Sequence, residues 1–188
     1  MVNGTSGDDT FIAPSQSLDV SVANGGAGTD TLNATLADED DATVVTSSAI
    51  EVFNLRDTDD GVAAISLDFT NADGVTQVWN DRSVDASQMT VEGLSTDVAA
   101  GIRSTASDYT VEYESVTGTT DSATLVAEEA EAGATFTAAG IETLNVQTTG
   151  SDSSSVALDG NDFTALNVSG AQDFDAGALD AEAVTIDA

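Results

Sequence analysis

A stretch near the start of the chain combines glycines and an aspartate at a spacing that suits calcium. Residues 25–32 read Gly-Gly-Ala-Gly-Thr-Asp-Thr-Leu, so that Asp30 follows three glycines and Leu32 comes two places later. Glycine permits positive-φ turns that point carbonyl oxygens inward, and carboxylate and carbonyl oxygens are the ligands that calcium prefers. The leucine would anchor a short strand in a core. The chemistry expected here is the binding of a divalent cation.

A similar segment lies upstream. Residues 4–11 read Gly-Thr-Ser-Gly-Asp-Asp-Thr-Phe, which places Asp9 and Phe11 where the other copy has Asp30 and Leu32. The offset between Asp9 and Asp30 is close to the length of one coil of a parallel β-roll. We therefore expect the two segments to lie on neighbouring coils and to share an ion.

The net charge narrows the choice of partners. The chain holds 34 acidic residues and only three basic ones, Arg56, Arg82 and Arg103, for a formal net charge of −31. Such a chain repels nucleic-acid phosphates and anionic membrane surfaces, so neither is an expected partner. High net charge favours disorder unless it is neutralised, so we predict that folding depends on calcium or high salt. A halophilic protein of unrelated role would share this acidic bias.

Several residue types that carry chemistry are missing. The chain has no histidine, lysine or cysteine, which removes disulfides, thiolate metal sites and the usual general base. A hydrolase or lyase would have to rely on paired carboxylates, and we expect no enzymatic activity. No apolar run approaches the roughly 20 residues of a membrane span, so membrane insertion is not expected. The N-terminus has no signal-peptide pattern, so the chain would either be exported by another route or be a fragment with an added Met1.

From residue 50 onward a second pattern recurs. Residues 50–55 (Ile-Glu-Val-Phe-Asn-Leu) and 141–146 (Ile-Glu-Thr-Leu-Asn-Val) are nearly the same phrase, and residues 163–168 repeat its second half. Weaker copies begin at positions 75 and 181. The gap between the copies at 75 and 141 is three times the step from 141 to 163, and strand-like runs at 89–91, 109–113 and 124–126 would fill the missing coils.

These repeats predict the fold class. A period of about 22 residues with one short strand per copy is typical of a stacked solenoid. We therefore expect an all-β protein, a parallel β-solenoid with coils of about 20 residues, and the alternative is a β-sandwich. Residues 127–132 favour at most one helical turn. Residues 1–36 would form N-terminal calcium-binding turns, and residues 37–188 a solenoid domain continuous with them.

The glycine-rich motif at 25–32 resembles the nonapeptide of the repeats-in-toxin (RTX) family of secreted calcium-binding β-roll proteins. Together with the Ile-Glu-Thr-Leu-Asn-Val phrases, it makes the chain similar to surface-layer and matrix proteins of Gram-negative bacteria. The resemblance implies secretion by the type I route and calcium held between turns of adjacent coils. Long RTX arrays have many tandem copies and this chain has two, so we expect one or two ions. The ligands that the resemblance implies come from Gly7, Asp8, Asp9, Gly26, Gly28 and Asp30.

A second acidic cluster follows the apolar run at 50–55. Asp57, Asp59 and Asp60 are further candidate calcium ligands at a coil corner, as are the acidic residues at 71–74 and 159–162. The alternative for each cluster is an Asx-rich turn. The three arginines are expected to pair with neighbouring acids. Trp79 is either an exposed stacking platform or a partly buried indole.

The expected function is structural. The chain would be a secreted, calcium-stabilised subunit of a surface layer, filament or biofilm matrix, assembling with copies of itself through solenoid ends or edges. The alternative is an adhesin or carbohydrate-binding module of a larger type I secreted protein, with cell-surface polysaccharide as its partner.

Overall fold

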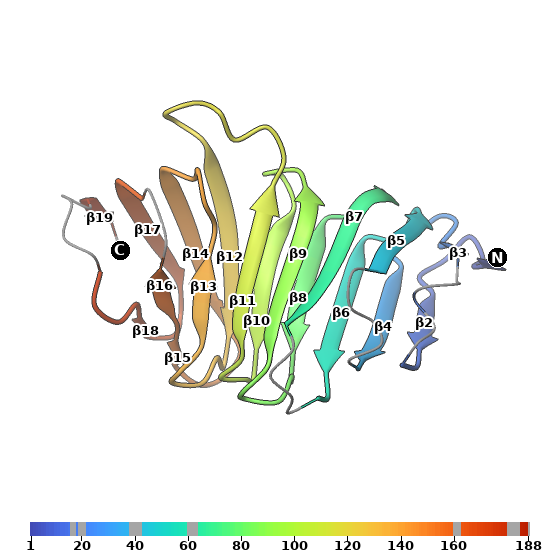
Figure 1. The fold of residues 1–188 in the computed structure, drawn as a ribbon, viewed down its shortest axis with the longest axis horizontal. Helices are drawn as coiled ribbons and strands as arrows, with labels where there is room; N and C mark the ends of the chain where they lie inside the picture. The colour runs from blue at the N-terminus through green and yellow to red at the C-terminus, as the bar shows by residue number, and fades with distance from the viewer. Residues whose placement is uncertain are drawn as a thin grey trace.

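The computed structural model is a stack of parallel strands with the two chain termini at opposite ends (Figure 1). It describes residues 1–15, 18, 22–37, 43–59, 64–159, 163–179 and 185–187. The chain passes alternately between two sheets, so that each coil contributes one strand to each sheet over most of the stack. The described residues contain no helix long and apolar enough to cross a membrane.

The strands fall into two large sheets and one small one. The nine-stranded sheet contains β2 (Thr10–Ala13), β4 (Thr31–Leu36), β6 (Val52–Asp57), β8 (Gln77–Asp81), β10 (Ala99–Arg103), β12 (Ser122–Glu128), β14 (Thr143–Thr149), β17 (Ala165–Gly170) and β19 (Thr185–Asp187). The eight-stranded sheet contains β1 (Val2–Asn3), β3 (Val22–Asn24), β5 (Thr43–Ser48), β7 (Ile65–Asp73), β9 (Gln88–Leu94), β11 (Asp108–Tyr113), β13 (Thr135–Thr137) and β16 (Ala157–Asp159). A separate pair is formed by β15 (Ser154–Ser155) and β18 (Phe174–Asp175).

The predicted parallel β-solenoid is confirmed. Every strand pair among the described residues is parallel, which excludes the antiparallel β-sandwich that was the alternative. The expectation of one strand per copy is wrong, because each coil supplies two strands. The runs at 89–91 and 109–113 lie in β9 and β11 of the eight-stranded sheet, whereas the repeated phrases lie in the nine-stranded sheet.

The register confirms part of the predicted periodicity. Val52 pairs with Gln77 and Leu144 with Leu166, which reproduces the steps between the copies at 50 and 75 and between those at 141 and 163. Three coils do span the long gap between 75 and 141, but their steps are unequal, as the pairs Gln77–Ala99, Ala100–Leu125 and Leu125–Val146 show. The last step is longer than predicted. A copy starting at position 181 would pair Ala165 with Ala183, whereas Ala165 pairs with Thr185.

The structure has no helical turn at 127–132, where the sequence allows at most one. Strand β12 continues to Glu128, paired on both sides, and the next residue, Glu129, takes a left-handed conformation with φ 53° that turns the chain. Helix-forming residue types do not decide the structure here, because the ladder hydrogen bonds and the burial of Ala127 against the core favour the strand.

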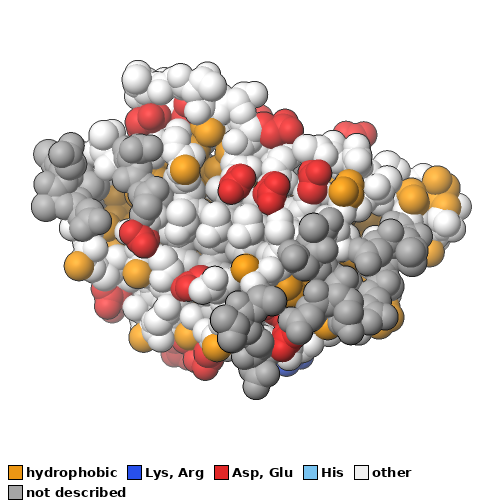
Figure 2. Space-filling model, viewed as in Figure 1, with side chains coloured by type: hydrophobic (Ala, Val, Ile, Leu, Met, Phe, Trp, Pro, Cys, Tyr) orange, Lys and Arg blue, Asp and Glu red, His pale blue; other side chains and the backbone are white. Residues whose placement is uncertain are grey.

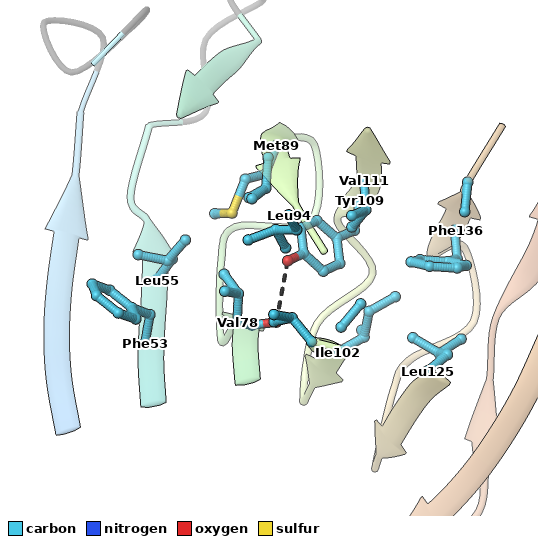
Figure 3. Packing of buried hydrophobic residues seen from close by; sticks show 14 of the residues in the cluster. Phe53, Leu55, Val78, Met89, Leu94, Ile102, Tyr109, Val111, Leu125 and Phe136 are labelled. Atoms are coloured by element: carbon cyan, nitrogen blue, oxygen red, sulfur yellow. Dashed lines mark hydrogen bonds between the residues drawn. The ribbon is translucent and has the colours of Figure 1, made fainter. Parts of the chain in front are cut away.

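The core lies between the two large sheets. Alternating inward residues fill it, as in β4, where every second side chain is buried. Phe53 of one sheet meets Phe69 of the other edge to face, with ring centroids 5.0 Å apart. The hydroxyl of Tyr109 donates to the carbonyl of Val78 at 3.1 Å and so links the two sheets through the core (Figure 3). One continuous apolar cluster extends from Ala13 to Leu166.

Candidate functional site

Three acidic side chains stack at one corner of the first coils. Asp9, Asp30 and Glu51 each stand immediately before a strand of the nine-stranded sheet, β2, β4 and β6. Oδ1 of Asp30 accepts the backbone N–H of Asp9 at 2.7 Å, and Oε2 of Glu51 accepts the backbone N–H of Asp30 at 2.7 Å. The carboxylates of Asp30 and Glu51 therefore each satisfy a backbone donor of the preceding coil. Charge-assisted bonds of this kind are among the stronger ones.

This stack unites the two sequence patterns. Farther along the solenoid, Oε2 of Glu142 accepts the backbone N–H of Asp121 at 2.8 Å, so the glutamate of each Ile-Glu phrase has the role that Asp30 has in the glycine motif. Sequence reasoning missed Glu51 and Glu142. The signal was present, because both Asp30 and Glu51 precede an x-apolar-Asn sequence: Thr31-Leu32-Asn33 and Val52-Phe53-Asn54. The asparagines stack as well, since Nδ2 of Asn54 donates to Oδ1 of Asn33 at 2.7 Å.

Glycine is required at this corner by close packing between coils. A Cβ on Gly25 would overlap the carbonyl oxygen of Ala49 on the next coil and the carboxylate of Asp30. A Cβ on Gly4 would likewise overlap the carbonyl oxygen of Gly25. Gly26 and Gly28 have φ of 108° and 124°, so the positive-φ turns predicted for the motif are present.

The two copies of the motif differ in how they satisfy their aspartates. Oδ2 of Asp9 accepts the backbone N–H of Thr5 at 2.6 Å and the Thr5 hydroxyl at 2.9 Å. In the second copy Gly26 takes the place of Thr5, and Oδ2 of Asp30 has no hydrogen-bond partner among the described residues although Asp30 is completely buried. A buried carboxylate oxygen without a partner is costly, and a bound cation would offset that cost.

The structure brings the other predicted ligands of the motif close together. Oδ1 of Asp8 accepts the backbone N–H of Thr29 at 2.8 Å, and a Cβ on Gly28 would lie 2.7 Å from the carbonyl carbon of Gly7. The six residues that the RTX resemblance implies therefore lie on two adjacent coils. Their hard oxygen donors fit calcium, although no group of three acidic side chains arranged to hold a metal occurs in the described parts of the chain. An ion here would need carbonyl oxygens of the glycine turns as well.

The second predicted calcium cluster lies elsewhere. Asp57 ends β6, at the opposite end of the strand from Glu51, and its backbone N–H donates to Oγ of Ser83 at 2.9 Å. The backbone N–H of Asp59 donates to Oδ1 of Asp57 at 2.9 Å, which is the contact of an Asx turn. Asp60, and residues 160–162 of the acidic cluster at 159–162, lie outside the described residues.

The arginines form part of a row of alternating charge on the nine-stranded sheet. Arg103 lies between Asp81 and Glu128, with Nη1 of Arg103 3.5 Å from the Asp81 carboxylate and Nε 3.0 Å from that of Glu128. The Nε contact is an ion pair without the alignment of a hydrogen bond. Arg82 lies 3.7 Å from Asp81. The predicted pairing with neighbouring acids is confirmed for Arg82 and Arg103.

Trp79 is a buried indole and not a stacking platform. Only 5% of it is exposed, its ring lies against Gly101, and the Arg103 guanidinium covers it at 4.2 Å from the ring centroid. Nε1 of Trp79 donates to Oε1 of Gln77 at 3.2 Å. A side chain on Gly101 would overlap the indole, so this glycine provides the space for Trp79.

The fold and this corner define a parallel β-solenoid with stacked carboxylates that tie successive coils together. No family model matches the sequence, and neither a curated protein nor a solved structure matches the chain.

Proposed function

We propose that this chain is a calcium-stabilised structural protein that assembles with copies of itself outside the cell, in a surface layer, filament or biofilm matrix. Secretion by the type I route belongs to the same proposal and rests on the RTX resemblance of the glycine motif. The observation that carries the proposal is that β1 and β2 each have one edge that no other described strand pairs with.

At the N-terminal end of the stack these two strand edges and several apolar side chains are exposed together. Within the described residues β1 pairs only with β3, and β2 only with β4. Met1 is 83% exposed, Val2 54% and Ile12 81%, and Figure 2 shows hydrophobic side chains gathered at this end of the molecule. An open edge flanked by apolar side chains is a template for another strand, so a further coil, supplied by a second copy, would continue both sheets.

The charge of the chain supports a role for calcium in this assembly. Two copies with a net charge of −31 each repel one another, and divalent cations reduce that repulsion. The residues that would hold the ion are Asp8, Asp9 and Asp30, with carbonyl groups of the glycine turns. When bound, calcium would supply positive charge at the unpaired oxygen of Asp30, one coil from the unpaired edge of β2. Folding of the first coils and assembly would then depend on the same ion.

A single substitution at the open edge tests the assembly. Ile12→Asp places a charge on edge strand β2, and Val44→Asp places the same charge on an apolar residue of β5 that is 45% exposed within the stack. By sedimentation velocity in calcium we expect the unmodified chain and Val44→Asp to form particles larger than a monomer, and Ile12→Asp to remain monomeric. A monomeric unmodified chain, or an Ile12→Asp chain that assembles normally, would refute the proposal.

A further inference from the structure

All three arginines of the chain line one groove on the outer surface of the nine-stranded sheet. The groove has a volume of about 350 Å³, within the range of small-ligand sites. The face of the molecule seen in Figure 2 carries many acidic side chains, and basic ones appear only at its lower edge. Besides Ile12 and Ala34, the lining residues are polar and include one carboxylate: Asn33, Thr35, Asn54, Arg56, Asp81, Arg82 and Arg103.

Pairing with acids does not account for this clustering. Arg103 is held between two carboxylates, but Arg56 forms no ion pair within the described residues, and its Nε donates to the backbone carbonyl of Arg82 at 3.1 Å. The Arg82 side chain is 60% exposed. In a chain with 34 acidic residues, stability alone favours arginines dispersed among carboxylates, because adjacent like charges repel. The groove instead concentrates the three basic side chains of the chain.

The groove also holds an acceptor without a donor. Asn54 uses its Nδ2 to donate to Asn33, and its Oδ1 is buried without a hydrogen-bond partner in the described part of the chain. A ligand hydroxyl would satisfy this oxygen once the side chains that cover it move aside. The exposed guanidinium groups of Arg56 and Arg82 suit a carboxylate, which arginine binds through two parallel hydrogen bonds. The groove therefore combines donors for an anion with an acceptor for a hydroxyl.

We propose that this groove binds a hydroxylated carboxylate, supplied by a uronic acid residue of an acidic polysaccharide. A free hydroxy acid has the same chemistry and is the other source of such a ligand. The inference does not depend on calcium-driven assembly, because none of the groove's arginines belongs to the glycine motif or to the open strand edge.

Equilibrium dialysis of the calcium-loaded chain at physiological ionic strength tests the groove, since it tolerates both monomers and assemblies. The probes are galacturonate, a galacturonate oligomer, gluconate and neutral galactose. We expect the uronate probes to bind and galactose not to bind. Arg56→Gln should weaken uronate binding about tenfold or more, because hydrogen bonds to charged groups are strong, and Arg56→Lys should weaken it less. Gln147→Glu makes the same change in net charge on an exposed site of β14 and should have no effect.

The outcomes separate the sources and the competing explanations. An oligomer that binds more tightly than gluconate identifies the polysaccharide, and the reverse order identifies a free hydroxy acid as the ligand. Uronate binding that survives both Arg56→Gln and Arg82→Gln unchanged would mean that bound calcium, and not the groove, holds the carboxylate, and would overturn the inference. Equal binding of galactose would overturn it too.

Discussion

The carboxylate of Glu51 accepts the backbone N–H of Asp30 at 2.7 Å, and Glu142 holds Asp121 in the same way at 2.8 Å. An acidic residue immediately before a strand of the nine-stranded sheet thus joins its coil to the preceding one. The same corner serves the glycine motif and the Ile-Glu phrases, so the acidic residues of this chain are structural ties as well as sources of charge.

Replacing Glu142 tests this tie away from the candidate calcium site. Glu142→Ala leaves the N–H of Asp121 without its acceptor, and we expect it to lower the free energy of unfolding by about 1–3 kcal/mol. Glu142→Gln keeps a carbonyl oxygen at the same position and should lose less. Urea denaturation measures both. Equal losses in the two variants would show that the hydrogen bond to Asp121 is not what Glu142 contributes.

The close approach between coils predicts that substitution of one glycine of the motif lowers the stability strongly and that substitution of another hardly changes it. In Gly25→Ala the new Cβ overlaps the backbone of Ala49, and we expect a loss of about 3 kcal/mol or more, at the upper end of overpacking costs. In Gly7→Ala the Cβ meets nothing within 4 Å, so the stability should be nearly unchanged. The measurement is the denaturation midpoint of each variant, compared where the m-values agree. A loss in Gly25→Ala alone indicates the packing effect, and a loss in both variants indicates a general requirement for glycine.

The single tryptophan reports on the outer surface of the nine-stranded sheet. Gly101→Ala pushes the indole of Trp79 off the sheet, and we expect a red-shifted fluorescence emission together with a loss of about 1–3 kcal/mol in stability. Because the chain has no other tryptophan, the spectrum has one source. An unshifted emission maximum in a folded Gly101→Ala variant would contradict the packing of Trp79 against Gly101.

Two buried tyrosines predict an alkaline loss of stability. Burial raises the pKa of Tyr109 well above its usual value, with a smaller contribution from Tyr113, and burial also raises the pKa of Tyr113. Below about pH 10 both are protonated in the folded and unfolded states, and their full contribution to stability is present. Above that pH the unfolded chain releases protons that the folded chain keeps, so the free energy of unfolding falls by about 1.4 kcal/mol per pH unit for each tyrosine.

The absence of lysine and cysteine makes this slope easy to assign. Urea titrations between about pH 10 and pH 11.5 should show the slope halved in Tyr109→Phe and in Tyr113→Phe. An unchanged slope in both variants would mean that neither phenol governs alkaline unfolding. At neutral pH Tyr109→Phe should also cost about 1 kcal/mol for its bond to Val78.

The sequence predicted the solenoid because strands of the nine-stranded sheet carry similar sequence phrases. Phe53, Leu144 and Leu166 stand at the same place in similar phrases, and all three are buried in the core. The eight-stranded sheet was missed as a repeat because its strands differ widely in length, from the short β1 to the long β7. Its register also shifts, for example between Val44 and Thr46, which blurs any period.

The candidate site was predicted only in part for a similar reason. The glycines and aspartates of residues 4–11 and 25–32 have types and spacing that indicate their turns directly. The role of Glu51 depends on which backbone N–H the preceding coil presents to it, and only the register between coils decides that. The clustering of Arg56, Arg82 and Arg103 likewise follows from stacking, since the three are far apart in the sequence.

Electron microscopy of the purified chain, with far-UV circular dichroism on the same samples, tests the central claim most directly. The samples contain calcium, excess chelator, or chelator with concentrated sodium chloride. The account predicts ordered assemblies and a β spectrum in calcium, loss of both in chelator, and no rescue by sodium chloride. Assemblies and spectrum unchanged by chelator would contradict it, and recovery in sodium chloride alone would assign the acidic surface to salt tolerance instead.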